Sequence, residues 1–262
     1  MSAIAAALVT WLEECSSPEA VEWLAKTRQA LLDGAPERKF FMAYSSVSRH
    51  FPHEVLTAAD LDEKAGDGLR EGWRPDRWVQ SEAARAILLL AVPAPDADAY
   101  RVLCDKLCAS ADANETVAFY RALPILPFPE AHAARCAEGI RTNMSSVFCA
   151  VAHDNPYPSE HLDEIGWNTM VLKALFIEVA LAPFVGLDER ANPRLMRMLC
   201  DYAHERWAAS RSVSPELWRC VGPYADEAAL ADLRRVVETG NDEEKRAAEQ
   251  ALRAAAEARQ GD

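Results

Sequence analysis

The sequence predicts an all-α fold, either a multi-helical bundle or an irregular α-solenoid. Of the 262 residues, 50% are hydrophobic and only 10 are glycine, while runs of alanine recur along the chain. This balance is typical of close-packed helices, because alanine has the highest helix propensity and glycine one of the lowest. Helix-start signals also recur, since Ser17 precedes Pro18 and Asn192 precedes Pro193, as N-cap residues and first-turn prolines do.

Three amphipathic helices are expected at the start of the chain. Apolar side chains recur at helical spacing through residues 4–12, 21–31 and 40–47, which places them on one face of each helix. The third helix ends near His50 and His53. The proline between these histidines disrupts the helical spacing that a shared metal would need, so we expect a surface turn there.

The middle of the chain contains several helix-start signals and helix-breaking residues. Thr57 and Asp60 predict a helix start of the capping-box type, and the two tryptophans of WRPDRW are expected to pack on neighbouring helices. Prolines in the segment 123–130 prevent a helix, while its apolar content predicts a packed connector. The helices expected around these features cover 75–91, 98–109, 115–123, 132–142 and 144–153.

The segment HDNPYPSEH, residues 153–161, is the strongest candidate for a boundary. Two prolines and an asparagine favour a turn there over a helix. We therefore expect an N-terminal helical sub-domain over residues 1–155 and a C-terminal one over 156–262. Their joint is predicted to be part of one continuous globular unit, not a flexible linker.

The C-terminal sub-domain is predicted to begin with a buried helix from Trp167 to about Leu181, because apolar side chains cover nearly its whole circumference. A second helix starts after Asn192, and Arg206 falls within its apolar stripe. A buried guanidinium needs a carboxylate or carbonyl partner, since it cannot lose its proton. The nearest candidates in the sequence are Glu178 and Asp188.

The last part of the chain is expected to form a short helix and then a hairpin. Ser214 caps the short helix, and Gly222 ends it. The hairpin joins helices over 227–238 and 242–259, where Asn241 and Glu244 mark the second start. This pattern is typical of a HEAT-type helix pair at the end of an α-solenoid.

The charges in these two regions allow two interpretations. One is a structural ion pair that fixes how the helices cross. The other is a binding pocket, because perturbed charges in a cleft mark functional sites. The candidate pocket residues are Asn168, Lys173, Glu178, Asp188, Arg206, Trp207 and His204.

Catalytic and metal-binding motifs are not found in the sequence. It has no glycine-rich phosphate loop and no Gly-x-Ser-x-Gly elbow. Cys104 and Cys108 share a helix face and are expected to be buried thiols, while Asp201 and His204 are expected on an exposed face with Arg197. We therefore expect no metal and no cofactor.

Composition also limits partners and location. A net charge of −13 argues against a nucleic-acid partner and against anionic lipid. Seven scattered cysteines suit a reducing cytoplasm. No apolar run reaches the ~20 residues that span a bilayer, and Glu13 and Glu14 interrupt the opening segment that superficially resembles a signal peptide. We therefore expect a soluble cytoplasmic protein.

Three spaced runs carry a resemblance to a known family. They are WNTMVLKALF at 167–176, GLDERANPRL at 186–195 and DYAHERWAASRSVSPELWRCVGPY at 201–224. Together, mainly over residues 166–224, they resemble the C-terminal signature of the EboA family, which belongs to a bacterial gene cluster for secondary-metabolite traffic. The resemblance implies partners among small metabolites or other proteins of the Ebo cluster, and an indirect link to a membrane prenyltransferase. It carries over no catalytic residue.

Two functions therefore compete. The first is a non-catalytic helical scaffold or carrier in the traffic or processing of a metabolite precursor, which binds a small metabolite or partner enzymes. The second is an enzyme that acts on a small polar or prenylated metabolite through a buried cluster of Lys173, Glu178 and Arg206. Convergence of these three side chains on an enclosed cavity would favour an enzyme or a carrier.

Overall fold

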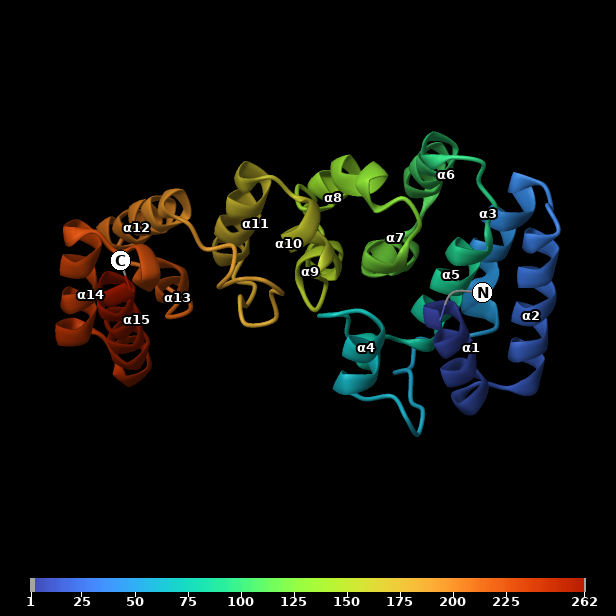
Figure 1. Ribbon diagram of the computed structural model, residues 1–262, viewed down its shortest axis with the longest axis horizontal. Helices are drawn as coiled ribbons and strands as arrows, with labels where there is room; N and C mark the ends of the chain where they lie inside the picture. The colour runs from blue at the N-terminus through green and yellow to red at the C-terminus, as the bar shows by residue number, and fades with distance from the viewer. Residues whose placement is uncertain (1–2, 262) are drawn as a thin grey trace. The chain divides into compact units, whose positions relative to one another are not determined.

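The structure is a computed structural model that describes residues 3–261, and its regular secondary structure is mainly α-helical (Figure 1). Within these residues the chain forms fifteen α-helices and five short 3-10 helices. Their only isolated β-bridge joins Val55 and Val79 in antiparallel fashion. The predicted all-α fold is therefore confirmed.

The helices group into two compact units, Met1–Leu162 and Asp163–Asp262. The sub-domain boundary expected from the sequence, between residues 155 and 156, stays a prediction. The α-helices of the first unit are α1 Ala3–Cys15, α2 Pro18–Leu32, α3 Glu37–Ser46, α4 Glu63–Leu69, α5 Gln80–Ala91, α6 Ala97–Ser110, α7 Ala113–Ala122, α8 Ala133–Gly139, α9 Ser145–Ala152 and α10 Tyr157–His161. Those of the second unit are α11 Glu164–Phe176, α12 Pro193–Ala208, α13 Leu217–Val221, α14 Glu227–Thr239 and α15 Asp242–Gly261.

Helix α5 forms the centre of the first unit, where α1, α2 and α7 pack against it (Figure 1). Every residue of α5 is buried except Leu90. Its buried carboxylate, Glu82, accepts a hydrogen bond from the backbone N–H of Val79 at 3.0 Å and lies 2.9 Å from the guanidinium of Arg121. A buried charge is tolerated when it is paired in this way.

Two helix starts in the first unit differ from the predictions. The capping box expected at Thr57 is absent, and α4 begins instead after Asp62, whose carboxylate accepts from the Ala65 N–H at 2.8 Å. The helix expected from Pro75 begins only at Gln80. Backbone pairing explains the delay, because the Leu56 N–H donates to the Trp78 carbonyl at 2.8 Å and holds that residue extended.

Two other expectations for the first unit are met in part. Trp73 and Trp78 pack on each other edge to face, with ring centroids 5.6 Å apart, and both are buried. They lie in non-helical segments on either side of the 3-10 turn Pro75–Arg77, and not on neighbouring helices as expected. Residues 123–126 of the proline-rich connector are buried as expected, whereas residues 128–130 are exposed. The connector contains two 3-10 turns, Leu123–Ile125 and Pro129–His132, and no α-helix.

The second unit contains the hairpin of α14 and α15, which pack side by side (Figure 1). Asn241 begins α15 as expected, because its side chain accepts from the Glu244 N–H at 3.0 Å while Glu244 caps the Asn241 N–H at 2.8 Å. The HEAT-type likeness of this hairpin stays a prediction. Helix α15 also packs against α13 and the following turn.

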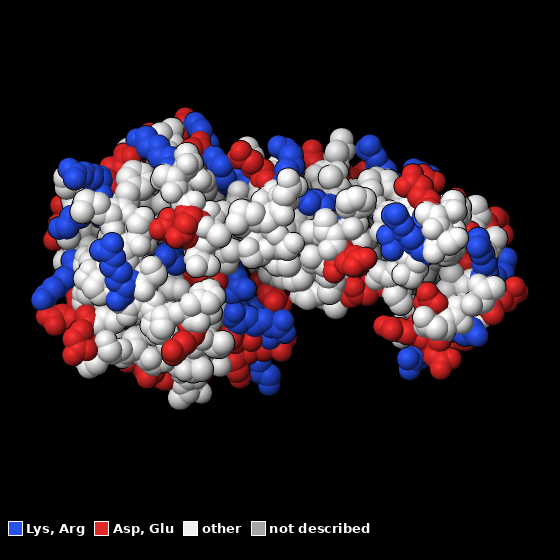
Figure 2. All heavy atoms as spheres, turned by 180° about the vertical axis from the view of Figure 1, so that it is seen from behind, with Lys and Arg blue, Asp and Glu red and all other residues white. Residues whose placement is uncertain are grey.

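The surface carries mixed charge. On the face drawn in Figure 2, Lys and Arg side chains are interspersed with Asp and Glu side chains and do not form one broad basic field. None of the helices within residues 3–261 combines the length and the apolar character that crossing a membrane requires. The seven cysteines are all free thiols.

Candidate functional site

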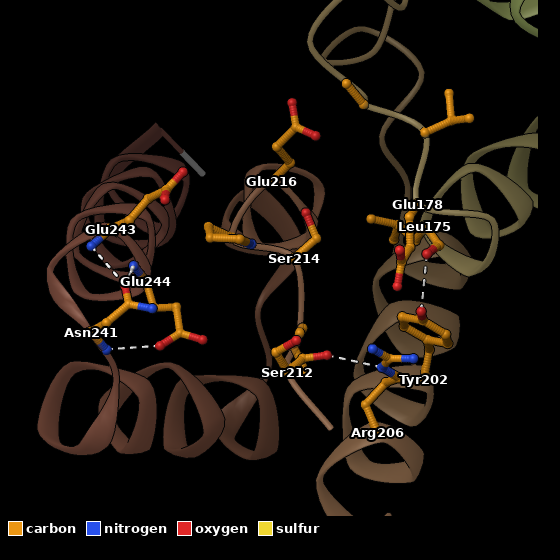
Figure 3. A pocket seen from close by; sticks show the side chains of 14 residues that line it. Leu175, Glu178, Tyr202, Arg206, Ser212, Ser214, Glu216, Asn241, Glu243 and Glu244 are labelled. Atoms are coloured by element: carbon orange, nitrogen blue, oxygen red, sulfur yellow. Dashed lines mark hydrogen bonds between the residues drawn. The ribbon is translucent and has the colours of Figure 1, made fainter. Parts of the chain in front are cut away.

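A surface cleft of about 410 Å³ lies within the second unit (Figure 3). Its walls come from the C-terminal end of α11, from α12, from the segment before α13 and from the start of α15. This volume lies within the range of about 300–1,000 Å³ that is usual for small-molecule sites. The cleft is lined by Leu175, Glu178, Val179, Ala180, Tyr202, Arg206, Ser212, Val213, Ser214, Pro215, Glu216, Asn241, Glu243 and Glu244.

Glu178 reaches the cleft through an unusual backbone conformation. Helix α11 ends at Phe176, before the predicted end at Leu181, because Glu178 adopts a left-handed conformation with φ of 58°. The Val179 N–H then donates to the Ala174 carbonyl at 2.8 Å, as in a Schellman cap. Glycine is usual at this position, since a residue with a Cβ is disfavoured there by about 1–2 kcal/mol.

The Glu178 side chain is therefore exposed, contrary to the predicted buried helix. Phe176, at the end of the same helix, is 74% exposed. Among the described residues, none forms a hydrogen bond or an ion pair with the Glu178 carboxylate. This carboxylate is free to accept hydrogen bonds from a bound molecule.

Arg206 lines the same cleft from α12. Its predicted carboxylate pairing is wrong, because its Nε donates instead to the backbone carbonyl of Ser212 at 2.9 Å. The side chain is only half-buried, so the guanidinium does not need the carboxylate partner that full burial would require. No other hydrogen bond or ion pair of this guanidinium exists among the described residues, which leaves its Nη groups available.

Two side chains of the cleft, Glu216 and Tyr202, form hydrogen bonds with backbone groups. Glu216 accepts hydrogen bonds from the N–H groups of Leu181 and Ala182, both at 2.9 Å. It therefore anchors the irregular segment that follows α11. The Tyr202 hydroxyl donates to the Leu175 carbonyl at 3.1 Å and fixes α12 against the end of α11.

The predicted pocket residues outside the cleft include Asn168 and Asp188. Asn168 is buried and exchanges amide hydrogen bonds of 2.9 and 3.2 Å with Asn192. Asp188 accepts a two-bond fork from Arg219, at 2.6 Å each, and the hydrogen bond of this fork raises the pKa of Arg219. The structure thus gives both residues protein partners and brings neither to the cleft.

The remaining predicted residues also lie elsewhere. His204 is 2.8 Å from Asp232 and is exposed, with no ion pair to Arg197 among the described residues. Trp207 stacks on Trp218 at 5.9 Å and lines a smaller neighbouring cavity of about 210 Å³. These side chains join α12 to α13 and α14.

Lys173 does not line the cleft, and burial lowers its pKa. The buried cluster of Lys173, Glu178 and Arg206, on which the enzyme hypothesis depends, is therefore not formed. Only Glu178 and Arg206 meet at the same cavity, and that cavity is open to solvent. The arrangement suits reversible binding, because it offers hydrogen-bond acceptors and a cationic fork.

Sequence reasoning missed most of the lining. The loops bring α11 close to Glu216, Glu243 and the segment 212–215. A local sequence pattern does not predict such contacts between distant segments. Asn241 and Glu244 carried a usable signal, because together they form the capping box at the start of α15.

Metal chemistry finds no support in the described part of the chain, which contains no group of three or more His, Cys, Asp or Glu side chains that could hold a metal ion. Burial raises the pKa of Cys104 and of Cys108 to about 12. Both thiols therefore stay protonated and unreactive at neutral pH.

Comparison with known proteins places the chain in a family. The family of the metabolite traffic protein EboA matches residues 4–222, so the match extends far beyond the runs at 166–224 that carry the resemblance. No curated protein and no solved structure matches the chain. Because the family match covers most of the sequence, the chain belongs to the EboA family of metabolite traffic proteins.

Proposed function

We propose that this protein is a non-catalytic carrier that binds a small polar metabolite in the cleft of its second unit. Its role would be in the traffic or processing of a secondary-metabolite precursor. The family description supports the metabolite traffic role. The cleft volume of about 410 Å³ supports a small molecule as the cargo.

The observation that carries this proposal is the conformation of Glu178. It occupies a left-handed helix cap, where glycine is preferred, and its carboxylate lies free at the cleft. Backbone strain of this kind often persists at functional sites because the side chain is needed there. Glu178 and Arg206 together would recognise a molecule with a hydroxyl or amine group and an anionic group.

The decisive experiment is the variant Glu178→Gly. Glycine relieves the strained cap, so the free energy of unfolding should rise by about 0.5–1 kcal/mol, while cargo binding should fall. Ser210→Gly is the matched control, because Ser210 also has a positive φ of 55° at a helix end but lies outside the cleft. It should give the same stabilisation without loss of binding.

Binding is measured with the purified full chain. The protein is incubated with a small-molecule extract of cells that naturally express it, and retained compounds are identified by mass spectrometry. Arg206→Met should lose the retained compound, whereas Arg197→Met, an exposed arginine on the same helix, should keep it. Retention by Glu178→Gly and Arg206→Met at the wild-type level would contradict the proposal.

Binding of partner enzymes by a scaffold is the competing reading. It predicts that the wild-type chain retains no compound and recovers other Ebo-cluster proteins in a pull-down. That result would replace the carrier with a scaffold.

A further inference from the structure

A smaller cavity, of about 210 Å³, adjoins the cleft within the second unit. Its walls come from the last turn of α12, the segment that follows, α13, the end of α14 and the start of α15. Of the described residues that line it, three carry a charge, and they are Arg211, Arg235 and Glu244. The lining is therefore positive overall, in a chain whose net charge is −13.

Two stacked tryptophans hold the guanidinium of Arg235 in place. Its central carbon lies 4.3 Å from the centroid of the Trp207 ring, which is a cation–π contact. Trp207 in turn stacks on Trp218, which is 1% exposed. The contact with Trp207 uses the face of the guanidinium, whereas the N–H donors lie in its plane. Arg235 is thus oriented by the ring and keeps its donors for another group.

The end of α12 fixes the backbone of Arg211 at the same cavity. Ser210 adopts a left-handed conformation with φ of 55°, and the Arg211 N–H donates to the Arg206 carbonyl at 2.8 Å, as in a Schellman cap. The side chain of Arg211 lines the cavity next to that of Arg235.

Both guanidiniums lack an anionic partner in the protein. Within residues 3–261, neither Arg211 nor Arg235 forms an ion pair or a side-chain hydrogen bond. The carboxylate of the lining, Glu244, instead accepts from the Asn241 N–H at 2.8 Å. Two like charges at one cavity repel each other, and an anion bound between them would remove this repulsion.

We propose that this cavity binds a phosphate group, held as a dianion by the guanidiniums of Arg211 and Arg235. Each guanidinium keeps its charge at physiological pH and can donate two parallel hydrogen bonds to phosphate oxygens. The hydroxyl of Ser212, which also lines the cavity, supplies a further donor.

Charge and volume favour phosphate over other anions. A phosphate monoester carries a charge of about −1.5 to −2 at pH 7 and so balances both arginines, whereas a carboxylate leaves one of them uncompensated. The cavity volume equals that of about seven water molecules, which is enough for a phosphate group but not for a large organic anion. The ligand is therefore inorganic phosphate or the phosphate end of a small monoester.

The test uses the purified full chain and isothermal titration calorimetry at constant ionic strength. Inorganic phosphate and methyl phosphate should bind at least about tenfold more tightly than acetate, because each engages both arginines through charge-assisted hydrogen bonds. Tighter binding of inorganic phosphate would identify the free ion as the ligand, and tighter binding of methyl phosphate would identify a monoester. Acetate binding as tight as that of both phosphates, or no binding of either phosphate, would overturn the proposal.

Two variants locate the site. Arg211→Gln and Arg235→Gln should each weaken phosphate binding about tenfold. Arg234→Gln is the matched control, because Arg234 is an exposed arginine of the same helix, α14, outside the cavity, and it should change the affinity by less than about twofold. Wild-type affinity in Arg211→Gln would overturn the assignment. If loss of the Trp207 contact unfolds Arg235→Gln, Arg211→Gln decides.

This inference does not depend on the proposed function. Glu178→Gly should bind phosphate as the wild type does, because Glu178 lines the larger cleft and not the smaller cavity. Failure of one proposal therefore leaves the other intact.

Discussion

Asn168 illustrates how a polar residue in a helix can serve structure instead of binding. It is 1% exposed, and its amide exchanges two hydrogen bonds with the amide of Asn192. Asn192 in turn caps α12, because its side-chain oxygen accepts from the Leu195 N–H at 2.8 Å. The pair thus ties the interior of α11 to the start of α12.

Asn168→Leu should therefore destabilise the protein. The substitution leaves the Asn192 amide with unsatisfied groups, which costs about 1–3 kcal/mol in the free energy of unfolding. Urea denaturation measures the change, with Thr169→Ala, at the exposed neighbouring position, as the control. A loss below about 0.5 kcal/mol would mean that the amide pair contributes little.

Asp76 gives a pH-dependent prediction. Both of its oxygens accept from Arg74 at 3.0 Å, and this hydrogen bonding lowers the pKa of Asp76 below its ordinary value of 3.8. A lowered folded-state pKa contributes stability above the unfolded-state value, and that stability is lost as pH falls through the folded-state value.

Asp76→Asn should therefore cost about 1 kcal/mol at neutral pH, and the difference from wild type should shrink below about pH 5. Urea titrations across this range measure it. Asp98→Asn, at a carboxylate that is 90% exposed, should show no such trend. A difference that stays constant with pH would exclude the ion pair as its source.

At the scale of elements, the helix starts capped by Ser17 and Asn192 were predictable, whereas the end of α11 was not. Ser17 and Asn192 cap their helices as expected, since each side chain accepts from a backbone N–H three residues on. A cap is a hydrogen bond between residues close together in the sequence, so a local pattern can predict it. The end of α11 depends instead on the left-handed conformation of Glu178, which no residue preference indicates.

Gly222 lies very close to the backbone of α15 in the second unit. A Cβ at this position would lie 2.7 Å from the carbonyl oxygen of Ala251 and 2.8 Å from its Cα. Both are backbone atoms of α15, so they cannot move without displacing the helix. The sequence identified Gly222 only as a helix stop and did not reveal this contact.

Gly222→Ala should destabilise the protein by about 1–3 kcal/mol through overpacking. Gly68→Ala is the control, because a Cβ there meets nothing within 4 Å and alanine favours a helix interior by roughly 0.5–1 kcal/mol. The two variants should move the thermal midpoint in opposite directions. Equal midpoints would show that α15 shifts freely to accommodate the methyl group.

At the scale of the whole molecule, the fold class followed from composition and periodicity, whereas the site did not. Its lining residues lie between positions 175 and 244. They come together only because the loops between the helices fold back on one another. The family match ends at residue 222, yet Asn241, Glu243 and Glu244 of the following segment also line the cleft. The last hairpin is therefore part of the candidate site.

The segment around Tyr157 belongs to the first unit, which ends at Leu162. Tyr157 is fully buried, and its hydroxyl donates to the Pro129 carbonyl at 2.5 Å. The Asn155 amide donates to the carbonyls of Tyr120 and Ala150, both at 3.0 Å. These contacts connect residues 155–157 to the core of the first unit.

A fragment of residues 1–162 should therefore fold more stably than one of residues 1–155, the boundary expected from the sequence. Loss of the buried Tyr157 ring leaves a cavity, which typically costs about 3–5 kcal/mol for a large aromatic side chain. Thermal unfolding followed by circular dichroism compares the two fragments. Within 1–162, Tyr157→Ala should reproduce most of the loss, while Ser159→Ala, at the partly exposed surface of α10, should not. Equal midpoints for the two fragments would instead favour the boundary at residue 155, because the first unit would then need nothing beyond it.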